Sequence, residues 1–271
     1  DWFVRKANGM QANEEWLPMR KPDQQDSTKI FRKFQFGDLA NFYMVDTRLF
    51  ARDEQGSGVD SARRMLGQAQ LDWLTEQMDS SYATWNVIGN QVMMAPLEFF
   101  GTAFNNDSWD GYPKERENVY NEIINRGIDN VVVLTGDIHT SWANDLPLNG
   151  YDNSNEDSIL NSVGVEIITP SITSSASPIP LPLGLVQVAN PHIRWADFTR
   201  KGYIILDLDT IRAHADWMHV STITDQNFSL NNAASWYTNN GETFLREAQQ
   251  ASVNSGNYPP LAPAMPTTVG M

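Results

Sequence analysis

Asp137 and His139 stand one residue apart, directly after the apolar run that extends from Val131 to Leu134. An aspartate supplies a hard oxygen that can bridge two cations, and a neutral histidine supplies a nitrogen for a transition metal. In an extended segment both side chains would point the same way, so both could reach one ion. The alternative is a strand-end cap beside a loop histidine, and the pair taken alone favours that plainer interpretation.

Other polar residues stand where a ligand could be bound. Asn90 and Gln91 end a short apolar segment, and α/β sheets bind ligands at the carboxyl ends of their strands. His192 and Arg194 lie in the Ser- and Pro-rich stretch 171–195, which we expect to be an ordered surface loop. For His192, the sequence favours a functional role and a capping role about equally. For Arg194, the alternative to a functional role is a surface ion pair.

These candidates need elements that hold them in place, and the sequence alternates helix-like and strand-like segments. Apolar residues recur at helical spacing in 68–78 and 112–127, and short apolar runs occur in 85–91, 130–139 and 163–170. The alternation predicts α/β layers.

Hairpins and terminal helices are expected around this centre. Partly alternating strands predict one hairpin within 29–50 and another within 200–220. We also expect a helix that begins near Lys6 and stops before Pro18, and a short amphipathic helix within 239–253.

Composition limits the possible classes of protein. The chain has 271 residues, of which 41% are apolar and 19% charged, so it is globular and long enough for one large domain or two small ones. It has no cysteine, which excludes disulfides and thiolate metal sites within it. No apolar run is long enough to predict a transmembrane segment. A Gly-rich phosphate loop and a Gly-x-Ser-x-Gly elbow are both missing, so kinase and α/β-hydrolase chemistry have no support.

The charge balance bears on the substrate. Nineteen Lys and Arg against 33 Asp and Glu give a net charge of −14, so we expect no electrostatic steering towards nucleic acid. An anionic substrate would need a local reversal of this field, and a multivalent cation provides one.

Several segments occur together in a characteristic order. They read GDLANFYMVDTRLF, MLGQAQLDWL, WNVIGNQVMMAPL, SWDGYPKERENV, VVVLTGDIHTSWANDL, VEIITPSITSS, NPHIRWADFTRKGYIILDLD and ADWMHV. This set resembles the PhoD-like alkaline phosphatase and phosphodiesterase family, within the calcineurin-like metallophosphoesterases. The resemblance runs from about Lys6 to Val220.

The resemblance implies a fold and an activity. The expected fold is an α/β, four-layer α/β/β/α sandwich, of which residues 1–224 supply the carboxyl-terminal part. Residues 225–271 would then be an extension with the short helix and a Pro-rich tail. Family members cleave phosphomonoesters and phosphodiesters outside the cytoplasm with a metal cluster of iron and calcium. The resemblance therefore implies a periplasmic or secreted hydrolase that acts on a phosphate ester.

The family's motifs carry over to particular residues. Asp137 and His139 match its last metal-binding motif, so the resemblance implies that they are metal ligands and catalytic residues. Many metallophosphoesterases place a ligand histidine where this chain has Asn90 and Gln91, so these are weak ligand candidates or bind substrate. His192 and Arg194 become candidates for phosphate contacts, because arginine can engage phosphate oxygens bidentately.

The family's upstream motifs are not found in this sequence. These are an Asp near the first strand, a Gly-Asp motif and a motif like Trp-Asp-Asp-His-Glu. We therefore expect an amino-terminal half of the same enzyme as a partner, joined or tightly associated before Asp1. The alternative is a non-catalytic, secreted binding or scaffold protein built on part of this fold.

Overall fold

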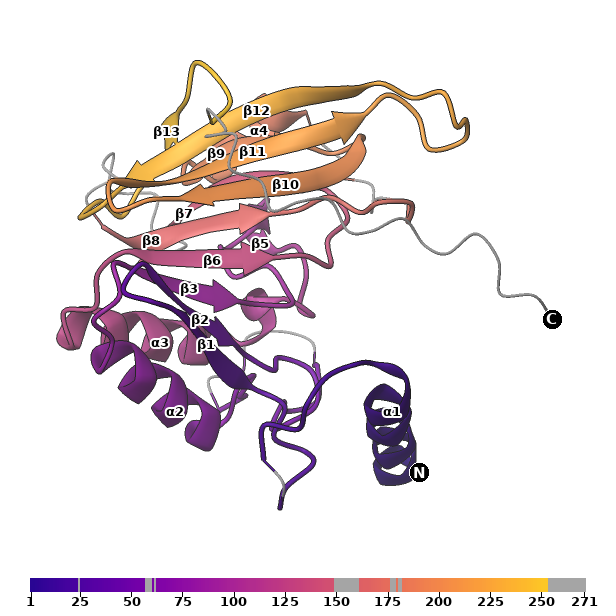
Figure 1. Ribbon diagram of the computed structural model, residues 1–271, viewed down its shortest axis with the longest axis vertical. Helices are drawn as coiled ribbons and strands as arrows, with labels where there is room; N and C mark the ends of the chain where they lie inside the picture. Colours follow the sequence, from indigo (N-terminus) through magenta and orange to yellow (C-terminus); the bar gives the residue numbers. More distant parts are fainter. Residues whose placement is uncertain are drawn as a thin grey trace.

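The computed structural model describes residues 1–23, 25–56, 60, 62–148, 161–175, 179 and 182–252. Two sheets lie one above the other, and helices cover one side of the larger sheet (Figure 1). The larger sheet has seven strands in the order β1-β2-β3-β6-β8-β7-β9, and the smaller has four in the order β10-β11-β12-β13.

The strands of the larger sheet are β1 (Arg32–Phe36), β2 (Ala40–Met44), β3 (Trp85–Gly89), β6 (Val131–Thr135), β7 (Ser141–Pro147), β8 (Ser162–Ile168) and β9 (Ile193–Asp197). Those of the smaller sheet are β10 (Lys201–Leu208), β11 (Arg212–Val220), β12 (Leu230–Asn239) and β13 (Arg246–Glu247). A separate pair is formed by β4 (Glu98–Phe99) and β5 (Thr102–Ala103). The helices are α1 (Trp2–Trp16), α2 (Gln68–Asp79), α3 (Pro113–Asn125), α4 (Leu183–Ala189) and the 3₁₀ helix η1 (Trp109–Gly111).

The centre of the larger sheet is parallel. β2 pairs with β3, β3 with β6 and β6 with β8, all in the same direction. The carboxyl ends of these strands therefore meet at one edge of the sheet, where the segments after β2, β3 and β6 come close together. β1, β7 and β9 complete the sheet as antiparallel neighbours.

Alternation along the central strands produces two apolar layers. On β6, Val131 and Val133 pack into the cluster shared with α2 and α3, whereas Val132 packs into the cluster shared with the smaller sheet. Both layers are buried, so β6 is apolar on both faces, as a central parallel strand requires. Its carboxyl end is accordingly held rigidly.

Much of this architecture agrees with the sequence-based predictions. Both hairpins, the helices α2 and α3, and the strands β3, β6 and β8 form where they were expected. Helix α1 ends before Pro18 as predicted but begins at Trp2, earlier than the expected start near Lys6. The predicted stretch 171–195 is a loop only in part, because it contains α4 and the start of β9.

The helix predicted within 239–253 is wrong. Residues 240 and 241 form a turn, residues 242–245 are irregular, and β13 follows and pairs with β12. Leu245 is buried in this irregular segment, and its amide donates to Asp145 at 2.8 Å. β12 pairs with β11 along its length, so residues 230–239 of the predicted extension are an integral part of the smaller sheet.

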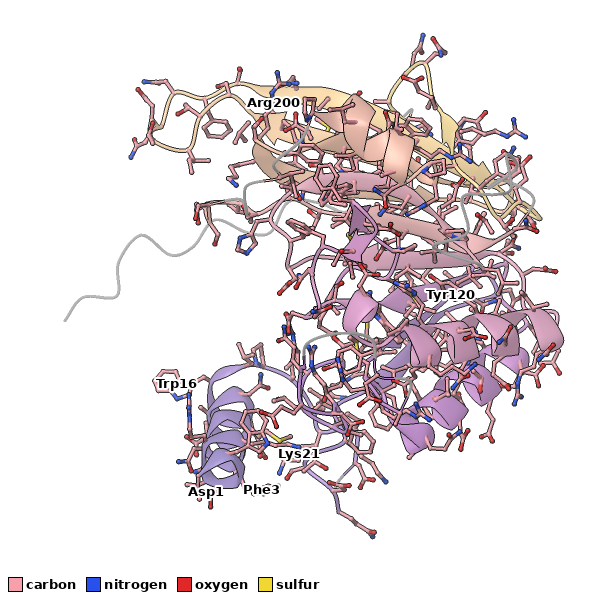
Figure 2. The ribbon with its side chains drawn as sticks, turned by 180° about the vertical axis from the view of Figure 1, so that it is seen from behind. Asp1, Phe3, Trp16, Lys21, Tyr120 and Arg200 are labelled. Carbon is pink, nitrogen blue, oxygen red and sulfur yellow. The ribbon has the colours of Figure 1, made fainter. Side chains whose placement is uncertain are left out.

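Helix α1 lies apart from the two sheets and buries none of its residues. Phe3 and Trp16 are 77% and 83% exposed, and Figure 2 shows Trp16 on the side of α1 that faces away from the sheets. A groove of about 500 Å³ separates α1 from residues 19–32. Within the part of the chain that the structure describes, no helix is long and apolar enough to cross a membrane.

Candidate functional site

The candidate site lies at the carboxyl ends of β2, β3 and β6. Arg48 follows β2, Gln91 follows β3, and Asp137 follows β6. These strands are parallel neighbours, so residues that are far apart in the sequence meet at one edge of the sheet. The sheet thus places the Asp137 turn where α/β proteins bind ligands.

The turn that carries Asp137 and His139 has an unusual backbone. Both residues have positive φ, +70° and +63°, in the left-handed region that non-glycine residues rarely occupy. Ile138 lies between them, is only 8% exposed, and packs into the core. The prediction of an extended segment is therefore wrong: the two side chains flank a buried isoleucine in a strained turn. Backbone strain of this kind is concentrated at functional sites.

The histidine of this turn is oriented by its second ring nitrogen. His139 Nδ1 lies 2.8 Å from the carbonyl oxygen of Ser175, so Nδ1 carries the proton and donates it. In the neutral tautomer that this bond selects, Nε2 carries the lone pair, and it has no hydrogen-bond partner among the described residues. Metal-binding histidines are typically held in this way, because the donated bond fixes the tautomer and the ring.

The aspartate of this turn belongs to a charged cluster. Asp137 Oδ1 accepts a hydrogen bond from Arg48 Nη2 at 2.8 Å, and its side chain is 40% exposed. Arg48 Nη1 contacts both carboxylate oxygens of Asp107, at 2.9 and 2.7 Å. Asp107 also accepts from Arg52 Nη2 at 2.7 Å. Burial would lower the pKa of Arg48, but the carboxylates of Asp107 and Asp137 outweigh it and raise that pKa.

The loop that carries Arg48 is rigidly built. The carboxylate of Asp46 accepts the backbone amides of Arg48, Leu49 and Phe50, all within 2.9 Å. Gln91 Oε1 accepts both the amide and the hydroxyl of Thr47 at 2.8 Å. Its amide group donates to the carbonyl of Val45 at 2.7 Å. Gln91 therefore positions the Arg48 loop, and these contacts give no support to its predicted role in binding substrate.

Asn90 is also engaged inside the protein. Its side-chain nitrogen donates to Thr135 Oγ1 at 3.1 Å and to the carbonyl of Val92 at 2.5 Å. Its oxygen accepts from the indole of Trp109 at 3.2 Å. With 7% of its surface exposed, Asn90 joins the ends of β3 and β6 and does not present a free amide to a ligand.

His192 does not lie on an open loop. It is 2% exposed, and its Nε2 lies 2.8 Å from the carbonyl oxygen of Pro96. Burial lowers the pKa of His192 to about 4, with a smaller contribution from the charges of Arg116 and Arg194. The ring is therefore neutral at neutral pH, and its contacts give no support to the predicted phosphate contact.

Arg194 is paired in the interior. Its guanidinium contacts the carboxylate of Asp145, which is 0% exposed. Burial raises the pKa of Asp145 to about 6 against the opposing effect of Arg194. The arginine is thus the counterion of a buried carboxylate on β7, a stronger constraint than the surface ion pair considered as the alternative.

Asp137 and His139 fit a metal site, but only as part of its ligand set. Asp137 offers a solvent-facing carboxylate, and His139 offers an unprotonated nitrogen held by Ser175. No group of three or more His, Asp or Glu side chains that could hold a metal occurs among the described residues. A hollow of only about 10 Å³ lies beside Asp137, whereas the far larger groove is the one along α1. The types of residue at the end of β6, and not the size of a cavity, therefore identify the candidate site.

Sequence reasoning missed three charged residues of this cluster: Arg48, Arg52 and Asp107. The signal for Arg48 was present, because polar residues directly follow an apolar strand in the segment MVDTR, as they do after β3 and β6. Asp107 lies between β5 and η1, in a segment with no strand or helix pattern, and had no comparable signal.

Comparison with known proteins identifies the family. Residues 1–217 match the family model of the PhoD-like phosphatases. The chain is 32% identical over 276 residues to alkaline phosphatase D of Bacillus subtilis (strain 168), covering 94% of this chain and 46% of that protein. A solved structure described as the structure of PhoD matches with a TM-score of 0.79 at 30% identity, covering 93% of this chain and 50% of that one.

The chain thus spans about half the length of these relatives. The two alignments cover 94% and 93% of this chain. The chain belongs to the PhoD-like phosphatase family.

Proposed function

We propose that this chain forms part of a metal-dependent hydrolase of phosphoric esters, with Asp137 and His139 as metal ligands and catalytic residues. The observation that carries the proposal is the strained turn after β6, which projects a carboxylate and a free imidazole nitrogen from either side of a buried isoleucine. Family membership and the likeness to alkaline phosphatase D support the same chemistry. Phosphomonoesters and phosphodiesters are both within this proposal.

The chain's own residues have defined tasks in such a site. Asp137 provides an anionic oxygen at a point fixed by β6, and His139 provides Nε2 with its ring held by Ser175. Ile138 holds both in position through its burial. A bound metal cluster, which the family resemblance suggests to be iron and calcium, would neutralise the phosphate and activate a water molecule for attack. The cations would also explain how a chain with a net charge of −14 accepts an anionic ester.

We further propose that the amino-terminal half of the same enzyme completes the site and the four-layer sandwich. Two ligands are too few for a metal cluster, and the chain spans only about half the length of its relatives. α1 supports a partner as well, since an isolated 15-residue helix with no buried residue is only marginally stable in water. A periplasmic or secreted location follows from the family resemblance alone.

A non-catalytic binding or scaffold protein is the second candidate. The observation in its favour is that the described residues contain no group of three metal-binding side chains. Metal content and ester hydrolysis separate the two functions when they are measured on protein that includes the amino-terminal half. A protein that then holds metal and turns over an ester is the enzyme, and one that is metal-free and inactive is the scaffold.

The decisive experiment replaces the ligands one at a time. Asp137→Asn keeps the size of the side chain but removes the anionic oxygen, so we expect loss of metal and a fall in turnover by orders of magnitude. His139→Ala should act in the same direction but less severely. The double variant should lose little more than Asp137→Asn, because both changes act through one site.

Metal content per chain and hydrolysis of a chromogenic phosphate ester are measured for all three variants. Glu117→Gln on the exposed surface of α3 serves as a control that should behave as wild type. Wild-type metal content and rate in Asp137→Asn would return the turn to the plainer interpretation as a strand-end cap.

A further inference from the structure

We propose that Arg48 binds the phosphoryl group of the substrate, with Asp107 and Arg52 holding its guanidinium in place. This inference rests on the proposed function, since it assigns a phosphate-binding residue to that same site. The residue was not among the sequence-based candidates, and the two basic or polar candidates from the long loop, His192 and Arg194, are occupied elsewhere.

The first argument is position. Arg48 lies in the segment after β2, at the same edge of the parallel strands as the Asp137 turn, and it contacts Asp137 directly at 2.8 Å. Its backbone is fixed by Asp46 and by the Gln91–Thr47 contacts. Arg48 therefore projects from a rigid loop beside Asp137, the candidate metal ligand, and can contact a group that binds there.

The second argument is the division of the guanidinium's donors. Nη1 is fully engaged by Asp107, and one hydrogen of Nη2 is directed to Asp137. An arginine has five N–H donors, so Nε and the second hydrogen of Nη2 remain, and neither has an acceptor among the described residues. Adjacent N–H groups of a guanidinium match two oxygens of a phosphate. The Arg48 side chain is 36% exposed, so these donors can reach a ligand.

The third argument is charge. Arg48 and Arg52 carry two positive charges, and Asp107 and Asp137 carry two negative charges, so the four balance as they stand. When Asp137 serves as a metal ligand, its charge is shared with a cation, and Arg48 is left with surplus positive charge. Arg52, whose side chain is only 8% exposed, cannot leave Asp107 for solvent. Arg48 is therefore the member of the pair that is free to attract a phosphate.

The test measures phosphate binding separately from turnover. Protein that includes the amino-terminal half is supplied with iron and calcium and titrated with inorganic phosphate by calorimetry, and its metal content is measured in the same samples. The variants are Arg48→Ala and Arg48→Lys, with Arg126→Ala, an exposed residue after α3, as the matched control. Melting temperatures are recorded for each, because Arg48 also closes an ion pair.

We expect Arg48→Ala to raise the phosphate Kd by about 10- to 100-fold, the loss of a hydrogen bond to a charged group, with metal content unchanged. Arg48→Lys should lie between wild type and Arg48→Ala, since it keeps the charge but not the two adjacent donors. Arg126→Ala should match wild type.

Two outcomes overturn the role of Arg48 and leave the proposed function standing. One is an unchanged phosphate Kd in Arg48→Ala with the metal retained, even if the melting temperature falls. The other is loss of metal together with phosphate, which would make Arg48 a support of the metal site. A wild-type protein that binds neither metal nor phosphate would overturn both proposals.

Discussion

Replacing His192 by glutamine should change how the stability of the protein depends on pH. The histidine is 2% exposed, and burial lowers its pKa from 6.5 to about 4. Between these two values the unfolded chain binds a proton that the folded protein does not, so the stability contributed by this group is lost as the pH falls below 6.5. Glutamine can donate to the carbonyl of Pro96 but does not titrate.

The magnitude follows from the two pKa values. The full difference corresponds to roughly 3 kcal/mol, at about 1.4 kcal/mol for each pKa unit. Between about pH 7.5 and about pH 5, the wild-type protein should lose roughly 2 kcal/mol through His192 that His192→Gln does not lose. Asp145 has the opposite effect in this range, because its raised pKa of about 6 favours the folded state as the pH falls. Comparing variant and wild type at each pH cancels that contribution.

Urea unfolding at both pH values gives the four free energies required. Metal-free samples are used, so that binding does not add to the difference. The stability of His192→Gln relative to wild type should increase by about 2 kcal/mol from the higher to the lower pH. A relative stability that stays constant to within about 0.5 kcal/mol would refute the assignment of a buried, neutral histidine. Ester hydrolysis at alkaline pH should remain near wild type, whereas a residue that contacts phosphate would lose it.

Two further predictions concern the supports of the site. Arg194→Met leaves the carboxylate of Asp145 buried without its counterion, so urea unfolding at neutral pH should show a loss of about 3–5 kcal/mol. The loss should be smaller at pH 5, because Asp145, with a pKa of about 6 that removal of Arg194 raises further, is protonated there; an equal loss at both pH values would contradict this. Gly164→Ala would place a Cβ 2.6 Å from the carbonyl oxygen of Val131, so β6 and β8 must separate. The melting temperature and the metal content of the variant should fall together. A stable variant with normal metal content would show that the position of the carboxyl end of β6 does not depend on the close approach of Gly164 to Val131.

The sequence was informative wherever apolar periodicity and local turn signals agreed. Leu71, Leu74 and Met78 share a helical face and are buried on α2, and the apolar run after Val131 forms a central strand. β7 gave no such signal, because it contains Asn144, Asp145 and Pro147 and yet is buried at every position. The side chains of Asn144 and Asp145 contact Glu166 and Arg194 on other strands, and a local pattern cannot show these partners.

The candidate site, like the fold, could be predicted from the sequence only in part. Asp137 and His139 could be named as candidates because they match the resembled family's last metal-binding motif, but their left-handed backbone could not be predicted, since neither residue type requires it. Arg48 joins them only through the parallel pairing of β2, β3 and β6, which brings together residues separated by 89 positions. The order of strands in the sheet is a property of the whole fold, and spacing along the chain does not contain it.

The two left-handed residues have a consequence for attempts to improve the protein. A non-glycine residue held in this conformation costs on the order of 1–3 kcal/mol, and glycine at either position would remove much of that cost. A screen for thermal tolerance alone will therefore favour glycine at 137 and 139, the two positions where the proposed chemistry needs a carboxylate and an imidazole. Selection for robustness and selection for catalysis act in opposite directions on this turn, so a library built for heat resistance should keep both residues fixed.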